Sequence, residues 1–447
     1  MSEPVIIKHG PGPLGRPLAT SFAASALIQP INILTGVLLA RVLGPQARGE
    51  LAAVLLWPSI LIAVGSLGAL DAAAYYGARG KTDRRTLVGT TLVIGLAQSV
   101  LLAGVGAAIV TFALDDYSDS TTRTAYLMLA YIPLNLIALY LMWLLNGFQR
   151  FAWFQILRLT TIGAAAVALV GLALSDELTV LAAALGYLLA NVVTLIGAAV
   201  LVQAESGISV RFNLPLARGL LGFGVRSHVS NVSSALNERL DQLLISVFLR
   251  PAQLGFYVIA VTLSSATILV GMSVYLVALP AVASLESGSA QATAARRLVA
   301  LTFVLSTVVS VPIVLFAPAL IELFFGGAFL PAADVARVLV VAAIAFSTNR
   351  ALGAVLKAIG RPLDPGVAEI IALGATVGGL AALLPAFGLM GAAVASLISY
   401  AVSTIWMVRR VMRALNLSAM SLFLPDRADL ERVWQLLRST RSYSGTL

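Results

Sequence analysis

The sequence contains no cysteine and only two histidines. The lack of cysteine excludes disulfides and thiolate metal sites. His9 and His228 are too far apart in sequence to form a recognisable metal-ligand motif. No Gly-x-x-x-x-Gly-Lys-Ser/Thr loop, paired-histidine motif or activated-serine signature is present, and the polar loops are short. The sequence therefore predicts no enzyme, no cofactor and no metal site.

Charge is also scarce. Charged residues make up 11% of the chain, against about 25% in soluble globular proteins. Hydrophobic residues make up 59%, and the mean hydropathy is +0.96. An aqueous core built from 447 residues could not enclose that much apolar surface. The composition therefore predicts an all-α polytopic membrane protein.

The apolar stretches predict about twelve transmembrane helices. A stretch without charge at 370–408 is too long for one helix, and a turn near Pro385 and Gly388 would divide it into two. Two further spans, at about 219–249 and 335–359, are interrupted by charges. The remaining eight are free of charge and lie at 17–40, 51–70, 86–114, 124–149, 159–175, 178–204, 251–285 and 298–321.

The basic residues predict the orientation. With the N-terminus inside, 22 of the 29 Lys and Arg residues fall on the cytoplasmic side, which agrees with the rule that positively charged loops stay inside. Both termini are then cytoplasmic. The net charge of +9 is spread over successive inner loops, so it reflects topology and does not predict nucleic-acid binding.

Short patterns recur about 206 to 211 residues apart and predict two repeated halves. Each half would hold six helices, so the two would enter the membrane from the same side as a parallel repeat. The matching residues are Leu43, Pro45 and Gly49 with Leu249, Pro251 and Gly255; Arg150 with Arg361; and Ala182, Ala184 and Ala190 with Ala393, Ala395 and Ala401.

The domain organisation follows from this repeat. Residues 1–203 form an N-terminal lobe with helices 1–6, and residues 215–413 form a C-terminal lobe with helices 7–12. Residues 204–214 are a cytoplasmic linker. Residues 414–447 are a cytoplasmic tail, in which 425–438 form either an amphipathic helix on the membrane surface or a partly ordered segment.

Polar and charged residues inside the predicted spans are candidates for a substrate site, because they are costly at membrane depth. Asp71 and Glu369 are instead expected near the interface in structural roles. The candidate substrate-binding residues are Asn32 in span 1, Asn237, Glu238, Arg239 and Asp241 in span 7, and Asn349 and Arg350 in span 10.

Two interpretations of these charges stay open. Arg239 and Arg350 could attract an anionic headgroup into a hydrated cavity, since arginine can bind two phosphate oxygens at once. Alternatively, Glu238 or Asp241, which are three residues apart and would share a helix face, could neutralise an arginine. The nearby acids favour pairing for Arg239. No acid is near Arg350 in sequence, which favours the cavity for that residue.

Two motifs resemble those of bacterial polysaccharide flippases in the multidrug/oligosaccharidyl-lipid/polysaccharide exporter superfamily. They are the run from Ala40 to Gly49 and the run from Leu236 to Leu244, which continues into Leu249, Gly255, Phe256-Tyr257 and Ala260. The resemblance implies two six-helix lobes around a cationic cavity in the bacterial inner membrane. It also implies alternating access that moves a polyprenyl-diphosphate-linked oligosaccharide to the outer leaflet for surface polysaccharide assembly. Arg239 and Arg350 would be the cavity arginines.

The resemblance further implies partners and alternatives. Membrane lipids, a coupling ion (proton or sodium), a glycan polymerase and glycosyltransferases are the expected partners. Lipid II flippases of the superfamily typically have fourteen helices. A count of twelve helices therefore favours a surface glycan other than the peptidoglycan precursor as the cargo. A drug/cation antiporter is the alternative, supported by Glu238 and Asp241 but opposed by the arginines. A scaffold without transport would not need buried charges.

Overall fold

The computed structural model describes four stretches of the chain, which are 15–114, 117–208, 211–285 and 288–424. Within these stretches the chain is helical and forms no strand. The predicted amphipathic helix at 425–438 lies outside the described residues. The chain divides into two compact units: unit 1 is Met1–Val232, and unit 2 is Ser233–Leu447.

Unit 1 contains seven α-helices, a short 3-10 helix and most of an eighth α-helix. They are α1 (Gly15–Gly65), α2 (Ala69–Arg79), α3 (Arg84–Ala113), α4 (Asp119–Leu127), η1 (Met128–Ala130), α5 (Tyr131–Gly147), α6 (Phe151–Leu174), α7 (Val180–Ser206) and α8 (Leu214–Asn237). The boundary between the units falls inside α8, whereas the predicted linker 204–214 precedes this helix. The predicted lobe limits stay a prediction.

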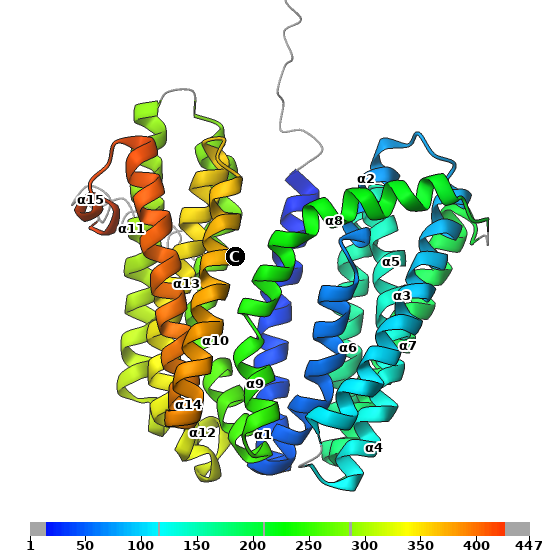
Figure 1. Cartoon of the computed structure of the whole chain (residues 1–447), viewed down its shortest axis with the longest axis horizontal. Coiled ribbons are helices and arrows are strands. Elements are labelled where there is room, and N and C mark those ends of the chain that lie inside the picture. Colours follow the sequence, from blue (N-terminus) through cyan, green and yellow to red (C-terminus); the bar gives the residue numbers. More distant parts are fainter. Residues whose placement is uncertain (1–14, 115–116, 209–210, 286–287, 425–447) are drawn as a thin grey trace, which may run out of the picture. The chain divides into compact units, whose positions relative to one another are not determined.

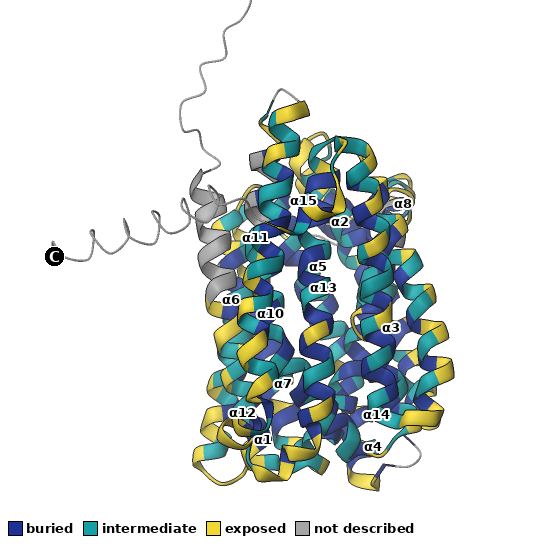
Figure 2. Cartoon of the chain, turned by 90° about the vertical axis from the view of Figure 1, so that its left-hand side faces the viewer, coloured by how far each residue is buried: buried dark blue, intermediate teal, exposed yellow. Residues whose placement is uncertain are grey.

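Unit 2 contains the end of α8, seven further α-helices and a second 3-10 helix. They are α9 (Leu240–Phe248), α10 (Pro251–Ala283), α11 (Gly288–Leu315), α12 (Ala317–Phe325), η2 (Gly327–Ala332), α13 (Ala333–Ala358), α14 (Leu363–Leu415) and α15 (Ala419–Phe423). Buried residues follow α13 along its whole length, so this helix forms the centre of unit 2 (Figure 2).

The two longest helices each fold back at a glycine (Figure 1). Straight helices of 51 and 53 residues would be more than twice as long as the roughly 30 Å hydrocarbon core is thick. Gly44 in α1 and Gly388 in α14 have φ values of 72° and 54°, a backbone conformation that glycine adopts without strain. The predicted turn between Pro385 and Gly388 is confirmed.

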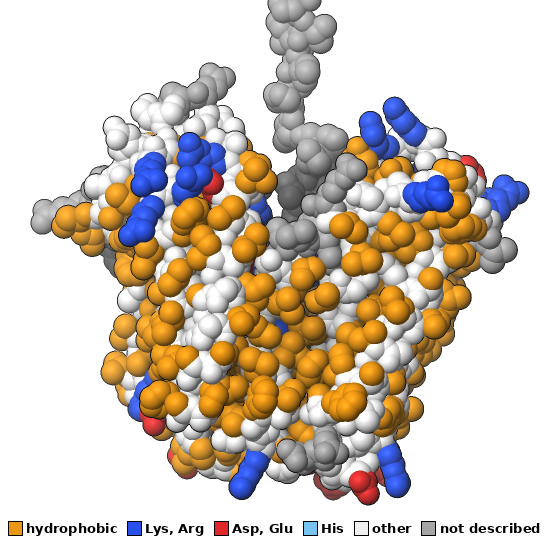
Figure 3. Space-filling model, viewed as in Figure 1, with side chains coloured by type: hydrophobic (Ala, Val, Ile, Leu, Met, Phe, Trp, Pro, Cys, Tyr) orange, Lys and Arg blue, Asp and Glu red, His pale blue; other side chains and the backbone are white. Residues whose placement is uncertain are grey.

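Within the described residues, nine helical segments are long and apolar enough to cross a membrane. The segments in α1 and α14 are each divided by their glycine, and α8 and α9 lie where the sequence predicts one further span that is interrupted by charges. The protein is therefore a polytopic membrane protein with about twelve transmembrane helices, as the sequence predicts. Apolar side chains cover the middle of each unit, and Lys and Arg gather near its ends (Figure 3).

The repeat is visible in how α5 and α13 end. Gln149 after α5 and Gly360 after α13 both have positive φ, 63° and 79°. Each forms the left-handed residue of a Schellman-type helix end, in which an amide reaches back to a carbonyl five residues earlier. The two equivalent bonds, both 2.8 Å, run from Arg150 to Leu145 and from Arg361 to Leu356. The two halves thus share a helix end 211 residues apart.

We predict opposite stability changes at these two positions. A side chain in the left-handed conformation costs about 1–2 kcal/mol, so Gly360→Gln should lower the melting temperature and Gln149→Gly should raise it. Nothing lies within 4 Å of a Cβ built on Gly360, so packing does not obscure the comparison. Thermal unfolding of the purified protein measures both changes, and shifts of the same sign would contradict the prediction.

Candidate functional site

The polar cluster predicted in span 7 lies at a break between two helices of the chain. α8 ends at Asn237 and α9 begins at Leu240, and Arg239 between them has a non-helical backbone (φ −136°, ψ −9°). The prediction that Glu238 and Asp241 share a helix face is wrong, because a spacing of three gives a common face only in a continuous helix. Glu238 is exposed, whereas Asp241 is buried.

Glu238 forms an ion pair with Arg350 of α13. The Arg350 Nη2 donates to the Glu238 Oε1 at 2.5 Å, and the guanidinium lies 4.8 Å from the centre of the Phe346 ring. No acid is near Arg350 in sequence, and its partner in the structure comes from 112 residues away. The pairing predicted between Glu238 and an arginine does occur, but not with the neighbouring Arg239.

The ion pair remains accessible. The side chains of Arg350 and Glu238 are 30% and 43% exposed. A guanidinium has five N–H donors, so Arg350 can hold Glu238 and still bind a second acceptor. Its flat shape suits two oxygens of a phosphate or carboxylate. This part of unit 2 can therefore bind an anion.

Asn237 lies beside the ion pair but is buried in a hydrogen-bonded network with α14. Its side-chain oxygen accepts from the Thr376 hydroxyl at 2.6 Å, and its amide donates to the Glu369 carboxylate at 3.4 Å. Ser399, on the other arm of α14, lies 2.8 Å from Thr376 and 2.8 Å from the Ala372 carbonyl oxygen. The network joins both arms of α14 to the end of α8.

Asp241 is the centre of a second buried group. Its Oδ2 accepts from the Tyr257 hydroxyl at 2.5 Å and from the Ser396 hydroxyl at 3.2 Å. Its Oδ1 accepts from the backbone N–H of Gln242 at 2.7 Å. Arg239 also attracts this carboxylate electrostatically. A carboxylate surrounded by oriented hydroxyls can bind a proton or a small cation.

The remaining predicted site residues are placed differently. Asn349 donates to the Tyr400 carbonyl at 3.3 Å, and its side-chain oxygen is buried without a hydrogen-bond partner among the described residues. Arg239 is exposed at the helix break. Asn32 is exposed on α1 and belongs to unit 1.

Sequence reasoning missed the residues that complete the two buried groups. Glu369, predicted to be interfacial and structural, belongs to the Asn237 network. Thr376, Ser396 and Ser399 carried no signal, because hydroxyl groups are common in transmembrane helices, where they bond to their own backbone. Tyr257 belongs to the second family motif, but its contact with Asp241 could not be read from that motif. Their role appears only from the packing of α10 and α14 on α9.

The repeated all-helical fold and a charged, partly accessible site at membrane depth define the class of polytopic membrane transporters. Within this class, the chain belongs to the family described as polysaccharide biosynthesis protein, whose model matches residues 38–334, more than half of the 447 residues. A comparison with curated proteins finds no match.

Solved structures of the multidrug/oligosaccharidyl-lipid/polysaccharide exporter (MOP) superfamily share this fold. The lipid II flippase MurJ in an inward closed conformation is 13% identical, with a TM-score of 0.74 and coverage of 89% of each chain. An inward-facing MATE family multidrug resistance transporter is 16% identical, with a TM-score of 0.72 and coverage of 87% of this chain and 96% of that one.

A third similar structure is described by the polarity of its binding pocket. It is a MOP superfamily transporter from Pyrococcus furiosus that is described as having a binding pocket of reverse polarity. It is 17% identical, with a TM-score of 0.53, and the match covers 90% of this chain and 95% of that one. At these identities the likeness establishes the fold alone, so substrate must be argued from the residues of this chain.

Proposed function

We propose that this protein is an alternating-access flippase that moves a polyprenyl-diphosphate-linked oligosaccharide from the inner to the outer leaflet for surface polysaccharide assembly. Arg350 would bind the diphosphate, and Glu238 would hold the guanidinium in place until substrate arrives. The bacterial inner membrane, cytoplasmic termini, and glycan polymerase and glycosyltransferase partners belong to the same proposal. Fusing a reporter to each terminus tests the orientation.

The partly exposed arginine on α13 carries the proposal. An arginine at membrane depth is costly unless it has a function or a partner, and Arg350 keeps free donors despite its pairing with Glu238. Membership of the polysaccharide biosynthesis family supports a glycan cargo. The structural neighbour MurJ is described as a lipid II flippase, which supports a cargo that is linked to a lipid.

A drug/cation antiporter is the second candidate. MATE multidrug transporters share the fold, and Glu238 offers an exposed carboxylate that a cationic drug could approach. The guanidinium of Arg350 beside it opposes this candidate, because it would repel a cation at the same site.

Flipping in reconstituted vesicles tests the proposal. A fluorescent, short-chain prenyl-diphosphate oligosaccharide placed in both leaflets is quenched from outside, and the rate at which the inner pool becomes accessible is measured. Vesicles containing the protein should exceed empty vesicles by at least about tenfold, a barrier difference of about 1.4 kcal/mol. Equal rates would contradict the proposal, and uptake of a cationic dye instead would support the antiporter.

The same vesicles test ion coupling. We propose that Asp241 takes part in binding the coupling ion, because its carboxylate is buried among hydroxyl groups. A proton or a sodium gradient should accelerate flipping, and Asp241→Asn, which keeps the size and hydrogen-bonding ability of the side chain, should remove that acceleration. If Asp241→Asn responds to both gradients as the wild type does, Asp241 has no part in coupling.

A further inference from the structure

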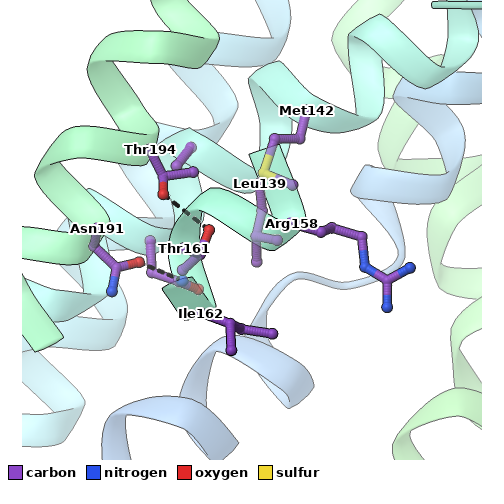
Figure 4. Close-up of a pocket in the computed structure, with 9 residues that line it drawn as sticks. Leu139, Met142, Arg158, Thr161, Ile162, Asn191 and Thr194 are labelled. Carbon is purple, nitrogen blue, oxygen red and sulfur yellow. Dashed lines mark hydrogen bonds between the residues drawn. The ribbon is translucent and has the colours of Figure 1, made fainter. Parts of the chain in front are cut away.

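An open pocket of about 180 Å³ lies on unit 1, between α5, α6 and α7. Its polar lining residues come from all three helices, and Figure 4 shows that the amide and hydroxyl groups lie on one side while the Arg158 guanidinium extends away from them. These residues are Asn135 on α5, Arg158 and Thr161 on α6, and Asn191 and Thr194 on α7. The proposed function uses none of them.

The uncharged polar groups are held in fixed positions. The Asn135 amide donates to the Asn191 side-chain oxygen at 2.7 Å, and the Asn191 amide donates to the Tyr187 carbonyl at 2.9 Å. The hydroxyls of Thr161 and Thr194 lie 2.8 Å apart. Asn191 and Thr194 are buried and hold their partners in place, whereas Asn135 and Thr161 are partly exposed and can hydrogen-bond to the hydroxyls of a ligand.

Arg158 provides a charge that no acid neutralises. Its Nη1 donates to the neutral Gln155 side chain at 3.0 Å, and it forms no ion pair within the part of the chain that the structure describes. Arg150, one residue before the same helix, does have an acid, with its Nε 2.6 Å from a Glu205 carboxylate oxygen. Arg158 lies directly before the predicted membrane span at 159–175, so its guanidinium is placed to bind an anionic group at the membrane interface.

We propose that this pocket is a sugar-phosphate subsite, in which Arg158 binds a phosphate and the amide and hydroxyl groups bind the sugar ring attached to it. The inference rests on the proposed function, since it assigns the ligand to the flipped substrate. About 180 Å³ equals the volume of about six waters at roughly 30 Å³ each. It is smaller than the roughly 300–1,000 Å³ of drug-sized pockets, so it accommodates one ring and not an oligosaccharide.

Binding of two soluble probes to the full-length purified protein tests the subsite. One probe is a short-chain prenyl diphosphate carrying a single N-acetylglucosamine, and the other is the same diphosphate without sugar. Arg158→Gln should weaken both probes by about tenfold, as expected for a lost charged hydrogen bond. Thr161→Val should weaken only the sugar-bearing probe, by about threefold. Thr160→Val and Arg123→Gln change similar groups that do not line the pocket, and they should bind as the wild type does.

Three results would overturn the subsite. If both pocket variants bind both probes with wild-type affinity while wild-type protein flips its substrate, only the subsite fails. If phosphatidylglycerol in nanodiscs displaces both probes from the wild type but not from Arg158→Gln, the pocket binds membrane lipid headgroups instead. If the wild type neither binds the probes nor flips substrate, the proposed function fails as well. Because Thr161→Val removes one hydroxyl without changing size, it tests the subsite even if Arg158→Gln does not fold.

Discussion

Replacing Arg350 and Glu238 together with glutamine will lower the flipping rate of a polyprenyl-diphosphate oligosaccharide by about tenfold to a hundredfold. A hydrogen bond to a charged group contributes about 1.5–3 kcal/mol, which corresponds to that range. The free donors of Arg350 are available to a diphosphate because its side chain is 30% exposed. The vesicle assay measures the loss, and size-exclusion chromatography verifies that the variant is folded.

The double substitution separates substrate binding from folding. Arg350→Gln alone would leave the Glu238 carboxylate without its counter-ion, and an uncompensated charge at membrane depth destabilises the protein. With both charges removed, two amides can hydrogen-bond across the same contact beside Phe346. A loss of transport in this folded variant would then result from the loss of the Arg350 guanidinium.

A second ion pair on α13 provides the matched control. Arg337 donates to Asp334 at 2.7 Å, and both side chains are exposed near the start of the helix. Neutralising this pair with Arg337→Gln and Asp334→Asn also removes one positive and one negative charge, here both from α13, and should leave flipping unchanged. Wild-type flipping by the Arg350–Glu238 double variant would instead mean that this pair is structural, and Arg350 would lose its role in substrate binding.

The spans and turns could be predicted because their signals are local. A run of about twenty apolar residues defines a membrane helix wherever it packs. A glycine in a long apolar run permits the reversal seen at Gly388, and the matched ends at Gln149 and Gly360 follow a short repeated pattern. These features depend on residues close in sequence, so the fold class followed from the sequence alone.

The site could be predicted only in part, because its contacts join distant segments. The polar residues of spans 7 and 10 could be identified because placing polar groups in lipid costs free energy. Their hydrogen-bond and ion-pair partners could not be identified in this way. The break at Arg239 turns Glu238 toward Arg350, 112 residues away, and Asn237 meets Thr376, 139 residues away. Such pairings depend on how the helices pack, and hydropathy does not encode that packing.

A close approach of α10 to α13 predicts a large loss of stability on substitution. A Cβ built on Gly271 of α10 would lie 2.5 Å from the Cα of Ser347 on α13. That atom belongs to a buried helix backbone, which cannot move aside as a flexible side chain could. Overpacking costs about 1–3 kcal/mol, so Gly271→Ala should lower the melting temperature, and Gly271→Leu should lower it further or prevent folding.

Gly374 of α14 supplies the matched comparison, because nothing lies within 4 Å of a Cβ built there. Alanine favours helix over glycine by about 1 kcal/mol, so Gly374→Ala should raise the melting temperature of the purified protein. Equal melting temperatures for Gly271→Ala and Gly374→Ala would contradict the close approach of α10 and α13. Ser347 is three residues from Arg350, so pushing α13 away at Gly271 should also move the ion pair. Gly271→Ala is therefore expected to lose flipping together with stability, whereas Gly374→Ala keeps both.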